Sequence, residues 1–109
     1  MQLPKHAHPI EREILQALVS GSINRGYDVT VWDGEEYAIK HSMSAEDALG
    51  AMSHTDEERL IFSDNECDHS YSGAAYIVYG NEPEYVIADY SAHEWLVKLA
   101  ESITDKYEV

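Results

Sequence analysis

Alternating carboxylates mark the one stretch of the chain whose spacing resembles a metal-binding loop. They are Asp64, Glu66 and Asp68. Calcium loops begin with this alternation, but they also carry a glycine at the sixth position and a glutamate at the twelfth, where this chain has His69 and Ala75. An ordinary acidic turn between two strands has the same composition and is the simpler interpretation. The alternative is a metal- or small-ligand-binding domain that combines these carboxylates with nearby histidines.

Histidine side chains are the other candidate metal ligands. His6 and His8 form an HxH pair near the N-terminus, and such a pair can bind zinc or nickel weakly. The other four are scattered, and no spacing rule brings them together; they are His41, His54, His69 and His93. The single cysteine, Cys67, has no second cysteine for a disulfide or a zinc motif. We therefore expect no resident cofactor.

Motifs of enzymatic catalysis are absent from the sequence. There is no GxSxG nucleophile turn, no HExxH helix and no glycine-rich phosphate loop. Cys67 lies among carboxylates, whose charges raise the pKa of its thiol and suppress the nucleophilic thiolate. The adjacent pairs Glu35-Glu36 and Glu57-Glu58 are typical of any charged surface. We predict that the protein is not an enzyme.

The charge balance limits the partners that the chain can have. It carries 21 acidic and 7 basic residues, a formal net charge of -14. Residues 26–90 hold 15 of the acidic groups against two basic ones, Lys40 and Arg59, so this β-rich middle has a net charge of about -13. Such a surface repels nucleic acid and anionic membranes, which bind through lysine and arginine. We predict a basic protein as the partner.

An aromatic anchor ringed by carboxylates would suit such a partner. Tryptophan and tyrosine are common at interfaces, and Trp32 lies beside an Asp33-Gly34 turn that two glutamates follow. A second acidic run comes later in the chain. The residues predicted to bind a partner are Trp32, Asp33, Glu35, Glu36, Asp56, Glu57 and Glu58.

The resulting hypothesis is a small protein-binding module that acts through its acidic middle. A sharper version is an inhibitor that imitates the phosphate spacing of nucleic acid and blocks nucleic-acid-binding machinery. The alternative is a solvated acidic surface that only keeps the protein soluble, with Trp32 covering the end of the sheet or packed on a helix.

The acidic segment opens with a β-hairpin at Tyr27–His41. A three-residue loop, with Gly34 in a left-handed conformation, would pair Val29 with Tyr37 and leave Trp32 at the turn. This register is favoured because it places five apolar side chains on one face. They are Tyr27, Val29, Val31, Tyr37 and Ile39.

Helical spacing and capping residues delimit three helices around the strands. Pro9 starts the first helix and Gly21 ends it, Ser44 caps the second, and Ser91 with Glu94 forms a capping box for the third. The expected helices are 9–20, 45–53 and 91–107, the expected later strands are 59–63, 71–79 and 85–90, and 64–69 is a turn.

The order α-β-β-α-β-β-β-α contains hairpins rather than βαβ units. It predicts an α+β fold in which three helices pack on a mostly antiparallel sheet of four to five strands. The 109 residues suit one domain, with residues 1–8 as a flexible arm. The short 85–90 strand is a candidate sheet edge, so a homodimer is also compatible with the sequence.

Two stretches resemble a group of small uncharacterised α+β proteins of proteobacterial phages and prophages. They are Val31-Trp32-Asp33-Gly34-Glu35-Glu36-Tyr37 and Ile87-Ala88-Asp89-Tyr90-Ser91. The resemblance implies a phage or mobile-element context and brings no functional residues with it.

The lone cysteine and the absence of a signal-peptide pattern or a long apolar run predict a cytoplasmic protein.

Overall fold

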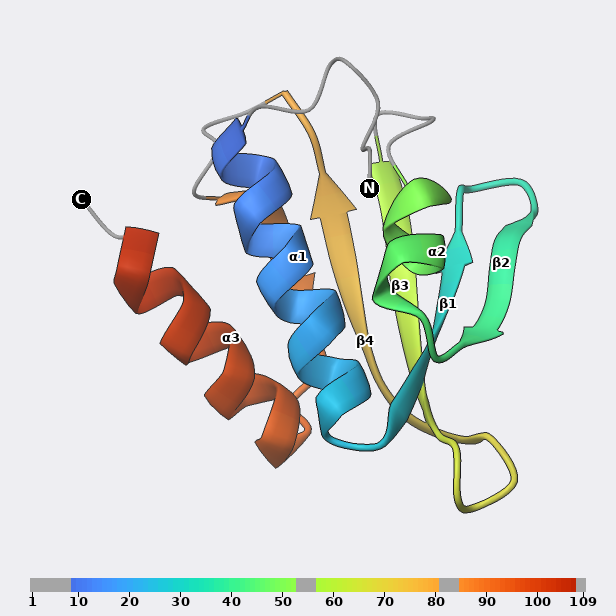
Figure 1. Ribbon diagram of the computed structural model, residues 1–109. Helices are drawn as coiled ribbons and strands as arrows, with labels where there is room; N and C mark the ends of the chain where they lie inside the picture. Colours follow the sequence, from blue (N-terminus) through green and yellow to red (C-terminus); the bar gives the residue numbers. More distant parts are fainter. Residues whose placement is uncertain (1–8, 53–56, 81–84, 108–109) are drawn as a thin grey trace.

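The computed structural model of the chain describes residues 9–52, 57–80 and 85–107. It confirms the α+β class: one antiparallel five-stranded sheet with three helices packed on one face (Figure 1). The order of elements is the predicted α-β-β-α-β-β-β-α. The elements are α1 (Pro9–Asn24), β1 (Tyr27–Trp32), β2 (Tyr37–Ser42), α2 (Ala45–Gly50), β3 (Glu57–Asp64), β4 (Ser70–Val78), β5 (Ile87–Tyr90) and α3 (Glu94–Tyr107).

The sheet has the strand order β2-β1-β3-β4-β5, and every neighbouring pair is antiparallel. β3, which follows β2 and α2 in the chain, pairs with β1 rather than with β2, so β1 is an inner strand with β2 on one side and β3 on the other. The edges of the sheet are β2 and β5.

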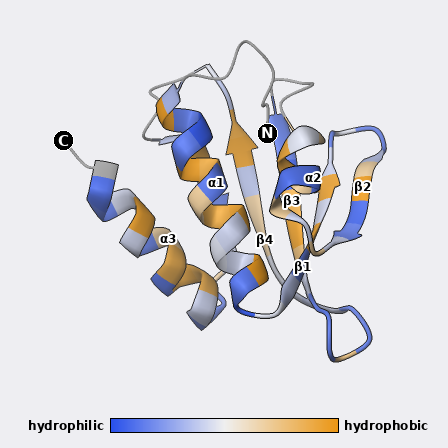
Figure 2. Cartoon of the chain, in the orientation of Figure 1, coloured by the Kyte–Doolittle hydropathy of each residue, from blue (hydrophilic) through white to orange (hydrophobic). Residues whose placement is uncertain are grey.

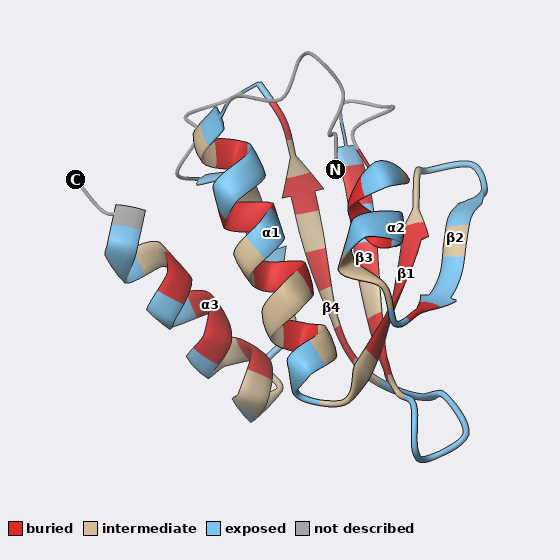
Figure 3. Cartoon of the chain, viewed as in Figure 1, coloured by how far each residue is buried: buried red, intermediate tan, exposed pale blue. Residues whose placement is uncertain are grey.

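The core lies between the sheet and the helices. Apolar residues at helical spacing on α1 and α3 face alternate residues of the strands, and each fully buried leucine or isoleucine contributes about 1.5–3 kcal/mol. Hydropathy and burial follow the same stripe on α1 and α3 (Figures 2 and 3). Its members include Ile14, Leu15, Leu18, Val19, Val29, Val31, Leu60, Phe62, Ile77, Leu96, Leu99 and Ile103.

The first helix runs past its predicted end. Gly21 does not stop α1, which continues to Asn24. A side chain at Gly21 would meet the Cδ1 atom of Leu99 at 2.8 Å, so the glycine allows α3 to approach α1 closely. The prediction was wrong because the glycine serves packing between helices rather than termination.

The hairpin has a different register from the predicted one. Trp32 is the last residue of β1 and pairs with Tyr37, while Val31 pairs with Ile39 and bulges follow on either side. The loop therefore has four residues, 33–36. The Oδ1 atom of Asp33 accepts hydrogen bonds from the amides of Glu35 and Glu36 at 2.9 and 2.8 Å, which stabilises this longer turn.

Several details of the predicted hairpin are confirmed and one face assignment is wrong. Gly34 has the expected positive φ of 106°. Tyr27 and Ile39 pack against the core formed by the buried Val29 and Val31, as predicted. Tyr37 does not join them, because the bulges turn it to the opposite face, where its side chain is 47% exposed.

Of the two caps predicted for the later helices, one is confirmed and one is wrong. The hydroxyl of Ser44 accepts the amide of Asp47 at 3.2 Å, as expected for the cap of α2. The capping box at the third helix is wrong: α3 begins at Glu94, and the hydroxyl of Ser91 accepts the amide of Ala74 on β4 at 3.0 Å instead.

The other boundaries differ by a few residues. The helix predicted to 53 ends at 50, β3 is longer at both ends than 59–63, and the strand predicted at 85–90 begins at 87. The predicted turn at 64–69 separates β3 from β4. The predicted arm, residues 1–8, is outside the described residues. Among the described helices, none has the length and apolar character needed to cross a membrane.

Candidate functional site

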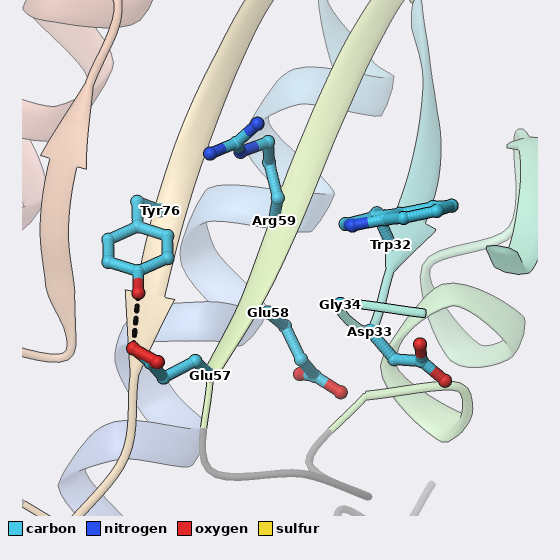
Figure 4. A pocket seen from close by; sticks show the side chains of 7 residues that line it. All are labelled: Trp32, Asp33, Gly34, Glu57, Glu58, Arg59 and Tyr76. Atoms are coloured by element: carbon cyan, nitrogen blue, oxygen red, sulfur yellow. Dashed lines mark hydrogen bonds between the residues drawn. The ribbon is translucent and has the colours of Figure 1, made fainter. Parts of the chain in front are cut away.

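The face of the sheet opposite the helices carries the candidate functional residues. Successive side chains of a strand point to opposite faces. Because Val29 and Val31 enter the core, Asp28, Thr30 and Trp32 of β1 point to the open face. Strand pairing then places Trp32 beside Arg59 of β3, and Arg59 beside Tyr76 of β4 (Figure 4).

This row borders a pocket of about 360 Å³. Its lining comes from β1, the following turn, β3 and β4, and consists of Trp32, Asp33, Gly34, Glu57, Glu58, Arg59 and Tyr76 (Figure 4). The hydroxyl of Tyr76 donates to the carboxylate of Glu57, and this hydrogen bond is the main cause that raises the pKa of the tyrosine. Glu58 is buried, and its carboxylate accepts the hydroxyl of Tyr79 at 2.7 Å.

Four of the seven residues predicted to bind a partner line this pocket, although they come from two separate segments. They are Trp32, Asp33, Glu57 and Glu58. Glu35 and Glu36 are exposed in the adjoining loop but are not among the lining residues. The seventh, Asp56, is outside the described residues. The indole of Trp32 is half-buried and meets the ring of Tyr37 edge-on at 4.8 Å.

The two basic residues of the acidic middle also lie on the open face. Arg59 lines the pocket, and the ammonium group of Lys40 lies 4.8 Å from the centre of the Tyr37 ring. Lys40 borders a second hollow of about 220 Å³, together with Thr30, Tyr37, His41, Ile61 and Ser63. The open face therefore combines aromatic rings with charges of both signs.

A second cluster forms where Asp28 meets two histidines. The Oδ1 atom of Asp28 is 2.9 Å from the Nδ1 atom of His41, and its Oδ2 atom is 2.6 Å from the Nδ1 atom of His69. The aspartate side chain is 0% exposed, whereas the histidine side chains are 41% and 42% exposed. The imidazole rings lie against each other, with centroids 4.1 Å apart and a tilt of 31°.

Unusual backbone conformations bring both imidazoles to the carboxylate. His41 has a φ of 50° and His69 a φ of 58°, in the left-handed region that few residues other than glycine adopt. Thr30 supports the first, because its Oγ1 atom accepts the amide of His41 at 2.9 Å. Turn hydrogen bonds support the second, since the amide of His69 donates to the carbonyl of Asp64 at 3.0 Å.

The carboxylates that the sequence offers as alternative metal ligands, Asp64, Glu66 and Asp68, occupy the turn that presents His69. The Oδ1 atom of Asp64 accepts the amide of Glu66 at 3.0 Å, so this side chain shapes the turn. Glu66 and Asp68 are exposed. In the described part of the chain, the set of side chains placed closely enough to ligate one metal ion is instead Asp28, His41 and His69. Cys67 is exposed, and its pKa is raised by a hydrogen bond and the charge of Asp64.

Sequence reasoning missed Asp28 because the strand pattern hides it. Alternation places Asp28 on the solvent side of β1, where an aspartate needs no explanation. Its partners lie 13 and 41 residues away, separations that match no ligand spacing. The available signal was the position of a charged residue inside an apolar strand, in a chain with several histidines of unassigned role.

Comparison of the chain with protein-family models, curated proteins and solved structures finds no match. The resemblance to small phage and prophage proteins therefore stays a prediction. The function is argued from the pocket at Trp32 and from the cluster of Asp28, His41 and His69.

Proposed function

We propose that this protein is a protein-binding module whose pocket at Trp32, Asp33 and Glu57 receives a lysine or arginine of a basic partner. The observation that supports the proposal is the convergence of two separate acidic segments and a tryptophan around one pocket on the open face. Neither segment forms such a site alone.

The chemistry of the pocket suits a cationic side chain. An ammonium or guanidinium group over an indole gains about 0.5–1 kcal/mol at an exposed site, and nearby carboxylates add charge-assisted hydrogen bonds. Trp32 offers the ring, while Asp33 and the exposed Glu57 lie on either side of the pocket (Figure 4). Many of the other acidic groups of residues 26–90 add a long-range field that attracts a basic protein.

Arg59 gives the pocket a direction. Its guanidinium repels a second cation above Tyr76, so the incoming basic residue enters from the Trp32 side and reaches Glu57 from there. An acidic group of the partner beside that residue would pair with Arg59. We therefore expect a partner segment of mixed charge to bind better than a uniformly basic one.

Binding of a short arginine-rich peptide, labelled with a fluorophore and followed by anisotropy, tests the proposal. We expect Trp32→Ala and Glu57→Gln each to weaken binding by roughly 3- to 10-fold, which is about 0.7–1.4 kcal/mol. Glu57→Gln keeps an acceptor for Tyr76, so the wall of the pocket is preserved. Arg59→Gln should tighten binding of this uniformly basic probe.

Matched substitutions elsewhere separate the pocket from general charge attraction. Glu101→Gln makes the same charge change on the exposed surface of α3, and Tyr85→Ala removes an aromatic ring that is 66% exposed. Both should change the affinity by less than about 2-fold. Equal effects of Glu57→Gln and Glu101→Gln, and of Trp32→Ala and Tyr85→Ala, would show that only the net charge of the protein attracts the peptide.

A further inference from the structure

Asp28, His41 and His69 have the composition of a transition-metal site. One possible ligand atom from each of the three side chains lies within 4.8 Å of the others. Two imidazole nitrogens and one carboxylate oxygen are ligands that suit zinc and related divalent ions, while calcium and magnesium prefer oxygen alone. We propose that these three residues bind a divalent transition-metal ion of the zinc class, independently of the pocket at Trp32.

The burial of Asp28 is the first argument for the site. A carboxylate with no exposed surface is costly unless positive charge or several hydrogen bonds compensate it. Its two hydrogen-bond partners among the described residues are imidazoles, which compensate only part of that cost when neutral, and two positively charged rings stacked 4.1 Å apart would repel each other. A divalent cation shared by the three side chains compensates the carboxylate without charging either ring.

The backbone is the second argument. Left-handed conformations outside glycine are uncommon and cluster at functional sites, where the strain serves to place a side chain. Here two of the three described non-glycine residues with positive φ are the two histidines of the cluster. They come from the end of β2 and from the turn before β4, so the fold reaches the same carboxylate twice by the same unusual means.

The geometry holds an ion after the two histidine rings rearrange. The nitrogen–oxygen separations of 2.9 and 2.6 Å are those of hydrogen bonds, with a ring proton between each pair. Zinc–ligand bonds of about 2.0–2.1 Å in a tetrahedron place neighbouring ligand atoms about 3.3 Å apart. To hold one ion, the two nitrogen–oxygen separations must lengthen by about 0.4 and 0.7 Å, and the widest ligand separation, which is up to 4.8 Å, must shorten toward about 3.3 Å. Rotation of the two half-exposed rings can supply these changes, and the ion then replaces the ring protons.

The site would keep an open coordination position. The described residues supply three ligands, and both rings are more than one-third exposed, so water can complete the shell. Three protein ligands plus water is the arrangement of open zinc sites, whereas purely structural sites have four protein ligands. His41 also borders the hollow that Thr30, Tyr37 and Lys40 line.

Calorimetric titration of the full-length chain with Zn²⁺ and absorption spectra with Co²⁺ test the site. The parent protein should carry His6→Ala and His8→Ala, because that pair can itself bind zinc. A Cys67→Ser change removes thiolate coordination as well. We expect one ion per chain, a dissociation constant in the micromolar range or below, and visible Co²⁺ bands of a four- or five-coordinate site.

The substitutions His41→Asn and His69→Asn are matched to the backbone. Asparagine tolerates the left-handed region and can donate to Asp28, but it is a poor zinc ligand. Each should weaken Zn²⁺ binding at least 10-fold, while His93→Asn, at a histidine bonded to Ser91 outside the cluster, should leave it unchanged. Circular dichroism confirms that each variant is folded.

A measurement on unsubstituted histidines keeps the test independent of the variants. Zn²⁺ should protect His41 and His69, but not His93, from acylation by diethyl pyrocarbonate, as mapped by mass spectrometry. Absence of Zn²⁺ and Co²⁺ binding by the parent protein, or equal affinity of the parent, His41→Asn and His69→Asn, would overturn the proposal. In either case the cluster is a hydrogen-bonded tie between strands, and the peptide binding at Trp32 is unaffected.

Discussion

Replacing Asp28 by asparagine is the sharpest test of how the histidine cluster stabilises the fold. The two side chains have nearly the same shape, so the change preserves packing around a residue that is 0% exposed. What changes is the chemistry: the carboxylate accepts from both imidazoles, whereas the amide has one acceptor and one donor group. One histidine must then present a nitrogen lone pair to the amide instead of a proton.

The expected cost follows from the two hydrogen bonds, whose energies are net of the desolvation of the groups that form them. A hydrogen bond to a charged group contributes about 1.5–3 kcal/mol and a neutral one about 0.5–1.5 kcal/mol. Both imidazoles are half-exposed, so the lower part of the first range applies, or about 3 kcal/mol for the pair. Two neutral bonds in the variant, taken likewise from the lower part of their range, return about 1–2 kcal/mol. We expect Asp28→Asn to lower the free energy of unfolding by about 1–2 kcal/mol.

Urea unfolding in the presence of a chelator measures this difference without any contribution from bound metal. In thermal unfolding, a two-state chain of this size should lose about 4–8 °C in melting temperature for each kcal/mol of lost stability. Urea unfolding of His69→Asn and of the double variant gives the coupling free energy between the two residues. We expect His69→Asn to cost less by about 0.5–1.5 kcal/mol when Asp28 is already replaced.

Two outcomes would refute the reasoning. A variant Asp28→Asn as stable as the wild type, within about 0.5 kcal/mol, would mean that the charge of the carboxylate contributes nothing to the folded state. Additive effects of the two substitutions would mean that the contact between Asp28 and His69 carries no energy of its own.

Two further predictions concern the packing of the helices and the reactivity of the thiol. Alanine gains helix propensity over glycine at both Gly21 and Gly50, but a Cβ atom at Gly21 would meet Leu99 at 2.8 Å, whereas Gly50 has open space around it. Gly21→Ala should therefore be less stable than Gly50→Ala by about 1 kcal/mol or more in urea unfolding, and equal stability of the two variants would contradict the close contact of α1 and α3. Asp64→Asn should move the pH midpoint of iodoacetamide alkylation at Cys67 downward, since the hydrogen bond and charge of Asp64 raise the pKa of that thiol in the wild type; an unchanged midpoint would exclude this cause.

The parts of the fold that follow from local periodicity could be predicted from the sequence. The stripe of Ile14 and Leu18 on α1 and the alternation of Val29 and Val31 on β1 depend only on the repeat of a helix or strand, and all four residues are buried. The sequence also indicated that carboxylates of two separate acidic runs could bind a basic partner. Only the folded sheet shows that Asp33 and Glu57, one from each run, line the same pocket.

The failures share a tertiary cause. Gly21 has the composition of a helix stop, but in the fold it gives Leu99 room to pack. Ser91 has the composition of a helix cap, but its hydroxyl accepts the amide of Ala74 on β4 instead. The partners of Asp28 are set by a bulge in β2 and a left-handed turn residue before β4, neither of which has a composition signal. These interactions depend on which strand lies next to which, information that a local pattern does not contain.

The strand order has a consequence for motion on slow timescales. β1 is hydrogen-bonded on both sides, while β2 lies at the edge of the sheet and is largely exposed. Edge strands open to solvent at a lower free energy than inner strands, so amide hydrogens of β2 should exchange before those of β1. Each such opening separates His41 from Asp28 while His69, held by a different segment, stays in place. Any interaction that holds His41 against Asp28 should therefore slow hydrogen exchange mainly along β2. The exchange rate of the β2 amides then reports how strongly the cluster holds this edge strand in place.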